Sequence, residues 1–181
     1  MYGRNGEDYI YGGEDEDYIE GGDDGDHIYG GNGENIMYGQ EGDDYIYGGN
    51  DKDYILGGTG DDHLYGGNGE NEIYGGHGND VIYDGDDGSY IEGSFGNDKI
   101  FAGGGNDVID PGEGDDYIQD DHGDDTIIFK AGYGTDTISD AAGNNTIQLS
   151  GLSMSDAVMS RINGSDLMIS FGADNIIIKQ Y

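Results

Sequence analysis

Carboxylates recur at a fixed interval through most of this chain, each after a glycine-rich segment. Asp62 lies at the sixth position of residues 57–65, and the same arrangement returns at residues 66–74 and 75–83. The unit is Gly-Gly-x-Gly-x-Asp-x-(Ile/Leu)-x, and its glycines permit a tight turn with exposed carbonyl groups. Carboxylate and carbonyl oxygens on a flexible loop favour Ca²⁺ over Mg²⁺. Because the chain has no Cys and only 4 scattered His, it offers no basis for a zinc, copper or iron site.

Aspartates at the sixth position are the predicted metal ligands. They are Asp8, Asp17, Asp26, Asp44, Asp53, Asp62, Asp80, Asp98, Asp107, Asp116, Asp125 and Asp136. Backbone carbonyl groups of the same turns complete the predicted ligand set, namely those of Gly48, Gly49, Asn50, Gly57, Gly58, Thr59, Gly60, Gly66, Gly67, Asn68, Gly69, Gly75, Gly76, His77 and Gly78. Stacking would bring each turn beside the turn that lies two units further along the chain. We therefore expect Asp62 to share ions with Asp44 and Asp80.

The composition restricts the possible partners. The chain has 181 residues, 39 Gly, one Pro, no Cys or Trp, and a formal net charge of −34 with only 6 Lys and Arg. Nucleic acids and anionic membranes are polyanions, so the negative charge of the chain excludes both as partners of its bulk surface. Cations are the natural ligands of such a surface. The sequence shows no signal peptide and no apolar run that approaches a membrane span. Because it opens within the repeat, we expect it to be part of a longer protein.

The nine-residue period predicts the fold. An apolar residue occupies the eighth position of every unit from residue 3 to residue 128. Each x-Ile-x segment is a minimal strand and each glycine-rich segment is a turn, so two nine-residue units make one coil. A fixed short period indicates that such coils stack as parallel strands. The core would be two facing ladders: Ile10, Ile28, Ile46, Leu64, Ile82, Ile100 and Ile118, and Ile19, Met37, Ile55, Ile73, Ile91, Ile109 and Ile127.

The C-terminal part has a different pattern. Residues 1–128 form the predicted roll, Phe129 and Lys130 then shift the period, and residues 129–148 are the last, register-shifted repeats. Residues 149–181 are predicted to form a capping β segment, because an open stack of strands needs an atypical end. We expect strands at 158–162, 167–171 and 175–179, with a hairpin turn at Asn163-Gly164. The predicted cap core is Leu149, Leu152, Val158, Ile162, Leu167, Ile169, Phe171, Ile176 and Ile178.

The unit at residues 57–65 resembles the haemolysin-type calcium-binding nonapeptide of the repeats-in-toxin (RTX) family, over about three quarters of the chain. The block 128–138 and the tail that follows it also resemble the segments after RTX arrays. The resemblance implies an all-β, right-handed parallel β-roll that binds multiple Ca²⁺ ions between adjacent turns, with a small antiparallel cap. It also implies a secreted, extracellular bacterial protein. Its parent would pass unfolded through a type I secretion apparatus by a signal beyond the cap.

Folding is expected to depend on the ions. Without them, carboxylates stacked about 4.8 Å apart would repel one another along the whole roll. One apolar residue per unit is also a thin core, which falls short of the roughly 1–2 kcal/mol of backbone entropy that each ordered residue costs. The free energy of Ca²⁺ binding would then be part of the free energy of folding.

The sixth positions form two rows, because alternate turns lie on opposite edges of a roll. The even row, named for its residue numbers, is aspartate throughout: Asp8, Asp26, Asp44, Asp62, Asp80, Asp98, Asp116 and Asp136. The odd row varies: Asp17, Asn35, Asp53, Asn71, Ser89, Asp107, Asp125 and Asn145. We predict a regular, fully loaded even row and an odd row with weak or missing sites near Asn35, Asn71 and Ser89.

No catalytic constellation stands apart from the repeat, so we expect a module that is not an enzyme. The first hypothesis is the calcium-triggered folding and secretion part of a larger toxin or exoenzyme. The alternative is a structural or adhesive calcium-stabilised segment of a large surface protein. The alternative would use an outward aromatic ladder, which we otherwise interpret as structural stacking: Tyr11, Tyr29, Tyr47, Tyr65, Tyr83 and Phe101. We expect His27 and His63 at the surface, and the acidic runs 84–87 and 120–121 at solvated turn edges.

Overall fold

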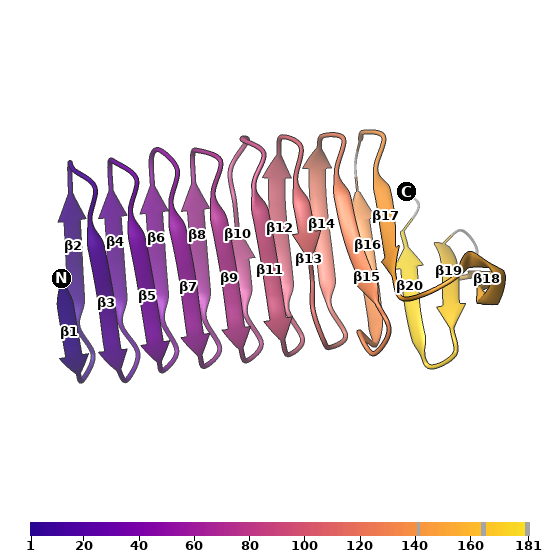
Figure 1. The fold of residues 1–181 in the computed structure, drawn as a ribbon, viewed down its shortest axis with the longest axis horizontal. Helices are drawn as coiled ribbons and strands as arrows, with labels where there is room; N and C mark the ends of the chain where they lie inside the picture. The colour runs from indigo at the N-terminus through magenta and orange to yellow at the C-terminus, as the bar shows by residue number, and fades with distance from the viewer. Residues whose placement is uncertain (141, 164–165, 180–181) are drawn as a thin grey trace.

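The structure is a computed structural model that describes residues 1–140, 142–163 and 166–179. Two long sheets face each other along an elongated roll (Figure 1). The odd sheet contains, in order, β1 (Tyr2–Asn5), β3 (Tyr18–Asp23), β5 (Ile36–Glu41), β7 (Tyr54–Thr59), β9 (Glu72–His77), β11 (Tyr90–Phe95), β13 (Val108–Asp110), β15 (Thr126–Lys130) and β17 (Thr146–Ser150). The even sheet contains β2 (Tyr9–Gly13), β4 (His27–Gly31), β6 (Tyr45–Gly49), β8 (His63–Gly67), β10 (Val81–Tyr83), β12 (Lys99–Gly104), β14 (Tyr117–His122) and β16 (Thr135–Asp140), followed by three C-terminal strands.

Strand pairing follows the period of the sequence. Ile46 of β6 lies beside Leu64 of β8, and Ile55 of β7 lies beside Ile73 of β9, so neighbouring parallel strands are separated by two units of the repeat. The chain alternates between the two sheets with each turn. The predicted parallel β-roll is therefore confirmed, and the two rows of turns lie along its opposite edges (Figure 1).

The core of the roll is the pair of facing ladders that the eighth positions predict. All of the predicted ladder residues are buried, and Leu64 and Ile73 in the middle of the roll have no exposed surface. One large side chain per strand fills a thin interior. The strands themselves alternate between buried and half-buried residues, as β6 and β8 show.

Glycine conformation sets the turns between the sheets. Gly58 and Gly60 have φ values of 126° and 134°, in the left-handed region that side chains disfavour. A Cβ atom on either residue would also collide with a carbonyl oxygen of the preceding coil, that of Gln40 or Gly42. Both conformation and space therefore require glycine here.

The end of the roll follows the two-residue shift. Ile118 lies beside Ile138, and Ile127 lies beside Ile147, so the partners in each pair are separated by one regular coil plus the inserted pair of residues. The extra Phe129 is buried in the core, where its ring lies 5.9 Å from that of Phe171. The insertion thus joins the last repeats to the cap.

The cap continues the even sheet. β20 (Asp174–Ile178) pairs in parallel with β16, and β19 (Asp166–Phe171) and β18 (Val158–Ile162) follow in antiparallel order. The predicted antiparallel cap is confirmed, with its strands within one residue of the expected bounds. The described pairing of β17, the last strand of the odd sheet, is with β15 alone. Of the predicted hairpin turn, Asn163 has a φ of 50°, and Gly164 lies outside the described residues.

The cap core is smaller than predicted. Ile169, Phe171 and Ile176 are buried, and Leu149, Leu152, Leu167 and Ile178 pack partly buried against them. The prediction for Val158 was wrong: it is 65% exposed, because β18 is the outermost strand of the sheet. A short 3₁₀ helix, η1 (Met154–Asp156), precedes β18 and was not predicted. No helix in the described part of the chain is long and apolar enough to cross a membrane.

Candidate metal centres in the turns

The sixth-position carboxylates form a continuous ladder along the even row. The backbone N–H of Asp44 donates to Oδ1 of Asp62 at 2.8 Å, and the N–H of Asp62 donates to Oδ1 of Asp80 at 2.8 Å. Each carboxylate is thereby fixed to the preceding coil through one oxygen. The second oxygen, Oδ2, is buried and has no hydrogen-bond partner among the described residues.

The first-position glycine leaves space beside that free oxygen. A Cβ atom built on Gly57 would lie 2.7 Å from the carbonyl oxygen of Gly75 and closer still to Oδ2 of Asp62. The same holds at Gly39, where a Cβ atom would lie 2.6 Å from the carbonyl oxygen of Gly57. At both glycines, a carboxylate oxygen of the same unit and a carbonyl oxygen of the next coil thus converge. Such an all-oxygen set fits Ca²⁺.

Nearly every predicted aspartate has such a buried oxygen, unpartnered within the described chain. The buried, unpartnered Oδ2 atoms in the described residues include those of Asp8, Asp26, Asp44, Asp53, Asp62, Asp80, Asp98, Asp107, Asp116, Asp125 and Asp136. Asp17 in the first coil is half-buried, and its Oδ2 would lie 2.6 Å from a Cβ atom on Gly12, so it faces the same kind of space. The structure therefore brings the predicted side chains into two rows of equivalent positions.

The predicted carbonyl groups divide into two sets. Those at the first position, Gly48, Gly57, Gly66 and Gly75, point toward the glycine of the preceding coil in their own row. Three others accept backbone N–H donors: Gly49 from Asn68, Thr59 from Gly42 and His77 from Gly60. The remainder belong to the same turns: Asn50, Gly58, Gly60, Gly67, Asn68, Gly69, Gly76 and Gly78.

Burial raises the pKa of these carboxyl groups when no cation is beside them. Desolvation is the main cause of the shift. The backbone N–H that donates to each carboxylate lowers the pKa, and neighbouring carboxylates raise it. The net result is a pKa of about 8 for Asp62 and about 7 for Asp80. The same cause raises the pKa of Asp44, Asp107 and Asp116 to about 7, of Asp136 to about 8, and of Asp53 and Asp98 to about 6. A buried carboxylate favours its neutral form unless a cation compensates it.

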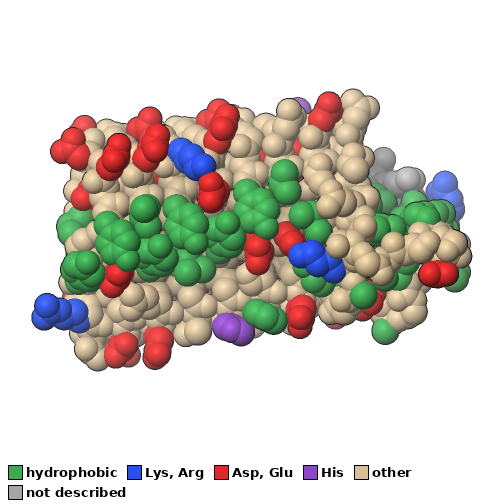
Figure 2. All heavy atoms as spheres, viewed as in Figure 1, with side chains coloured by type: hydrophobic (Ala, Val, Ile, Leu, Met, Phe, Trp, Pro, Cys, Tyr) green, Lys and Arg blue, Asp and Glu red, His purple; other side chains and the backbone are tan. Residues whose placement is uncertain are grey.

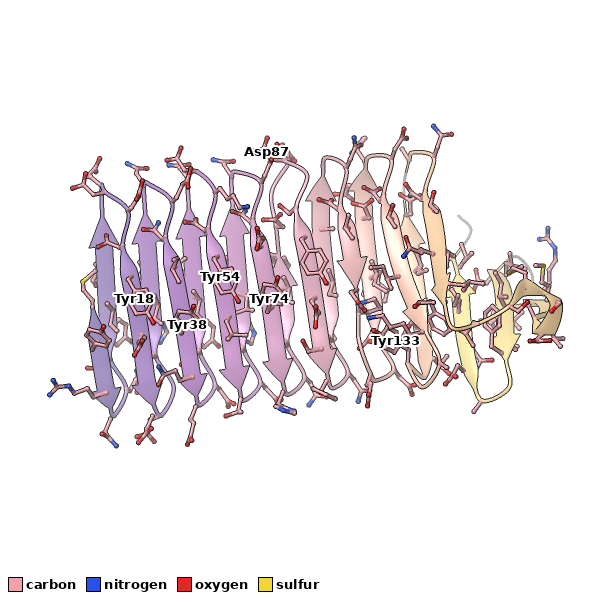
Figure 3. All side chains as sticks on the ribbon, in the orientation of Figure 1. Tyr18, Tyr38, Tyr54, Tyr74, Asp87 and Tyr133 are labelled. Atoms are coloured by element: carbon pink, nitrogen blue, oxygen red, sulfur yellow. The ribbon has the colours of Figure 1, made fainter. Side chains whose placement is uncertain are left out.

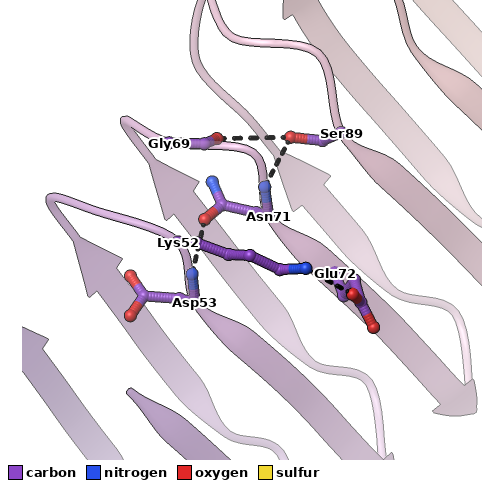
Figure 4. Close-up of polar contacts among 6 residues, drawn as sticks. All are labelled: Lys52, Asp53, Gly69, Asn71, Glu72 and Ser89. Carbon is purple, nitrogen blue, oxygen red and sulfur yellow. Dashed lines mark hydrogen bonds and ion pairs between the residues drawn. The ribbon is translucent and has the colours of Figure 1, made fainter. Parts of the chain in front are cut away.

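In the odd row, the three asparagines Asn35, Asn71 and Asn145 present an amide where a ligand oxygen would be. The N–H of Asp17 donates to Oδ1 of Asn35 at 3.0 Å, so Nδ2 takes the place of the free oxygen and donates to the carbonyl of Gly33 at 2.9 Å. Asn71 is held in the same way by the N–H of Asp53 at 2.9 Å (Figure 4). An N–H donor repels a cation, which supports the prediction of weak sites beside these residues.

Beside Asn71, the unit 84–92 has an aspartate at the first position instead of the sixth. Ser89 takes the sixth position and accepts the N–H of Asn71 at 2.9 Å (Figure 4). Asp84 takes the first position, normally glycine, and its Oδ1 accepts Nδ2 of Asn71 at 2.8 Å. Because Ser89 is neutral, Asp84 is the carboxylate that pairs with the Asn71 amide in this unit.

The expectation that both acidic runs are solvated was wrong for one residue in each. Oδ2 of Asp84 is buried and Asp120 is 1% exposed, because both occupy the first position of a unit and turn inward. Their neighbours Asp86, Asp87 and Asp121 are more accessible, and Figure 3 shows Asp87 at the turn edge. The signal was present in the sequence as an aspartate in place of the first glycine.

Aromatic rings stack along the outside of the even sheet. The predicted ladder is present, with ring centroids of Tyr47 and Tyr65 4.5 Å apart and nearly parallel. A second ladder of Tyr9, His27, Tyr45 and His63 runs beside it. The two histidines are thus half-buried against tyrosine rings instead of lying free at the surface.

The odd sheet carries a tilted aromatic stripe that was not predicted. Its tyrosines alternate between the seventh and ninth positions of successive coils and form the green band across Figure 2: Tyr2, Tyr18, Tyr38, Tyr54, Tyr74 and Tyr90. Figure 3 shows four of these rings along the strands. The centroids of Tyr38 and Tyr54 are 5.9 Å apart at 53°, which is ordinary side-chain packing on a sheet face.

Fold and turns together define a class, the parallel β-roll with rows of cation-binding turns. A family model for the RTX calcium-binding nonapeptide repeat matches residues 1–28, 20–55, 29–64, 47–82, 56–89, 83–118, 112–135 and 130–151. The chain belongs to this family, and its turns are calcium-binding repeats.

One similar solved structure is the extracellular lipase LipA from Serratia marcescens, with 16% identity and a TM-score of 0.35. The match covers 97% of this chain and 38% of the lipase chain, so the protein spans well under half of that structure. A search of curated proteins gave no match.

Proposed function

We propose that this chain is a calcium-dependent folding module, which is disordered without Ca²⁺ and folds when multiple ions enter its turns. The observation that carries the proposal is the row of buried Oδ2 atoms that lack a hydrogen-bond partner within the described residues. Each one requires either a proton or a cation, because an isolated buried carboxylate is strongly unfavourable. The sixth-position aspartates and first-position carbonyl groups would hold the ions, which supply the missing positive charge.

Lysines do not supply that charge. The ion pairs of the described residues join Lys52 to Glu72, Lys130 to Asp110 and Lys179 to Asp166, and none of these carboxylates is at a sixth position. With a net charge of −34, the roll would bring many uncompensated carboxylates together on folding. This charge balance supports a folded state that forms only with cations bound.

We further propose that the module belongs to a larger secreted bacterial protein that contacts a type I secretion apparatus and folds outside the cell. Membership of the RTX family and the acidic composition support this part of the proposal. We assign no reaction to the chain itself, since its buried carboxylates belong to the repeated turns and to the contacts that hold the cap.

A calcium titration tests the proposal. The purified chain is freed of metal, and its far-ultraviolet circular dichroism is followed while Ca²⁺ is added to extracellular levels, with bound ions counted by equilibrium dialysis. We expect a disordered spectrum at the start, a cooperative gain of β signal, and several ions bound per chain. Mg²⁺ at the same concentrations is the control and should produce much less structure. A spectrum that does not change on chelation would contradict the proposal.

A second candidate function, an adhesive segment of a surface protein, rests on the aromatic ladders. Tyr9 and Tyr11 at one end of the even sheet are 59% and 63% exposed. Further along the sheet, however, the faces of the rings stack against one another and are not available to a partner, which favours a structural role. Replacement of Tyr11 and Tyr29 by serine, measured at saturating Ca²⁺, would separate the functions. An adhesive segment would lose surface binding, whereas a structural stack would lose only part of its unfolding free energy.

A further inference from the structure

One gap in the odd row is bounded by three aspartates. Asp107 and Asp125 occupy sixth positions in adjacent coils, and Asp120 occupies the first position of the unit that contains Asp125. One oxygen from each carboxylate lies within 4.8 Å of the other two, and each residue is 1% exposed. Among the described residues, this is the one group of three or more potential metal-binding side chains with such spacing.

Each of the three carboxylates is oriented by the backbone. Oδ1 of Asp107 accepts the N–H of Ser89 at 2.7 Å, and Oδ1 of Asp125 accepts the N–H of Asp107 at 2.8 Å. Oδ1 of Asp120 accepts the N–H of Asp121 at 2.9 Å. The three Oδ2 atoms are buried and have no hydrogen-bond partner in the described part of the chain. The backbone therefore orients three buried carboxyl groups around one small space.

A comparison with Asp84 shows what is missing at this gap. Asp84 also occupies a first position, but an amide of Asn71 donates to it at 2.8 Å and the adjacent sixth position is the neutral Ser89. At Asp120 the adjacent sixth position is Asp125, a second carboxylate. The lysine of this region, Lys130, pairs with Asp110 at 2.7 Å instead. Among the described residues, no side-chain amide and no lysine donates to Asp120, whose Oδ2 is without a partner there.

We propose that Asp107, Asp120 and Asp125 form a three-carboxylate site for a hard cation, which binds Ca²⁺ more tightly than the other turns and has the strongest preference for trivalent lanthanides. The affinity of oxygen sites for Ca²⁺ rises with the number of charged ligands, and a third carboxylate favours a higher ionic charge. Asp120 is outside the repeated ligand set, so the site differs from those of the regular unit. The inference rests on the proposed function only in taking the turns as cation sites.

The test measures the affinity of individual ions with one charge removed at a time. Asp120→Asn removes the third carboxylate while keeping the side-chain volume, and Asp121→Asn is the matched control, since Asp121 is the exposed neighbour on the same strand. Stepwise chelation of the Ca²⁺-loaded full chain, and then its titration with La³⁺, gives the number and affinity of the ions while the roll is folded. Circular dichroism at saturating Ca²⁺ confirms that each variant folds, and Asp120→Gly, which restores the residue of the regular unit, provides a second variant.

The expected result is one ion per chain that binds more tightly than the rest, weakened about tenfold or more by Asp120→Asn and Asp120→Gly. Asp121→Asn should change the same affinity less than about twofold, because an exposed charge is screened. La³⁺ should displace this ion first. A tight ion that both Asp120 variants leave unchanged, or an absence of any distinct tight ion while the other turns bind Ca²⁺, would overturn the inference alone. A chain that binds no Ca²⁺ would instead contradict the proposed function.

Discussion

The even and odd rows are built from the same nine-residue unit but differ in how closely their residues match it. In the even row, every sixth position is aspartate, and every Oδ2 in that row is buried without a partner among the described residues. In the odd row, amides replace the carboxylates at Asn35 and Asn71, and each of these amides donates a hydrogen bond of its own. One edge of the roll is therefore uniform and the other is mixed.

The difference shows that one backbone accepts two ways of neutralising a turn. A cation can be shared between carboxylates, as the even row is arranged to allow. Alternatively, an amide, a hydroxyl and a relocated carboxylate can satisfy one another, as Asn71, Ser89 and Asp84 do. The second arrangement pairs only one oxygen of Asp84, because its Oδ2 is buried without a partner among the described residues. It therefore leaves fewer carboxylates for a cation to compensate than two sixth-position aspartates would.

The largest expected effect comes from removing carboxylates from one row at a time. The double variant Asp44→Asn/Asp62→Asn should raise the Ca²⁺ concentration for half-folding about tenfold. The reason is that Asp44 and Asp62 lie in adjacent coils of the even row and would share ions with each other and with their neighbours. The odd-row control Asp17→Asn/Asp53→Asn also removes two carboxylates, but each of them already adjoins an asparagine. Its midpoint should shift about threefold or less. Circular dichroism during Ca²⁺ titration gives both midpoints, and equal shifts would show that the rows are equivalent.

Without cations, pH should change folding in a direction set by the buried carboxyl groups. Burial raises the pKa of Asp62 to about 8 and that of Asp53 to about 6, against an ordinary value of 3.8. The folded state therefore binds more protons than the unfolded state, so this stabilisation is complete below the ordinary pKa and is lost as pH rises through the folded values. In metal-free buffer the folded fraction should be larger at about pH 5 than at about pH 8.

The same experiment compares one carboxyl group from each row. Because the folded-state pKa of Asp62 is about 8, Asp62→Asn should reduce the pH dependence of the folded fraction up to about pH 8. Because that of Asp53 is about 6, Asp53→Asn should reduce this dependence only below about pH 6. The two variants should therefore differ most between about pH 6 and pH 8. The folded fraction of each variant is measured by circular dichroism across the pH range. A folded fraction that rises with pH in metal-free buffer would contradict this prediction.

A smaller effect is expected where Asn71 and Asp84 form a hydrogen bond in the odd row. Asn71→Asp would set a carboxylate against Asp84 and remove a 2.8 Å hydrogen bond, at a cost of about 1–3 kcal/mol in unfolding free energy. Adding Asp84→Gly and Ser89→Asp restores the regular unit and should bind more Ca²⁺ than the natural chain. Urea unfolding and ion counting give the two quantities. Gln148→Glu, at an exposed position in the odd sheet, is the control and should have little effect on either.

The smallest effect concerns the aromatic ladders outside the two sheets. Tyr65→Ala removes a ring stacked between two neighbours, and should lower the unfolding free energy by about 1 kcal/mol. Tyr54→Ala, in the tilted stripe of the odd sheet, should cost no more than that, since its contacts are longer. Urea unfolding at saturating Ca²⁺ measures both. A much larger loss from Tyr54→Ala would show that the tilted stripe is the more stabilising one.

Most of the roll could be predicted because its period is short and has few interruptions. The eighth-position ladder and the positions of Asp44, Asp62 and Asp80 follow directly from the nine-residue spacing, and the predicted cap strands lie within one residue of those observed. The spacing does not determine contacts between coils where the unit changes. Asp120 and His27 show this limit: the direction of one side chain and the stacking of the other depend on neighbours in the adjacent coils.

The two-row interpretation is tested most directly by the occupancy of calcium in a crystal grown with a moderate excess of Ca²⁺, measured from anomalous diffraction. We expect full occupancy at every gap of the even row. In the odd row we expect occupancy beside Asp107 and Asp125, with low or missing occupancy beside Asn35, Asn71 and Ser89. Equal occupancy along both rows would contradict the distinction between them.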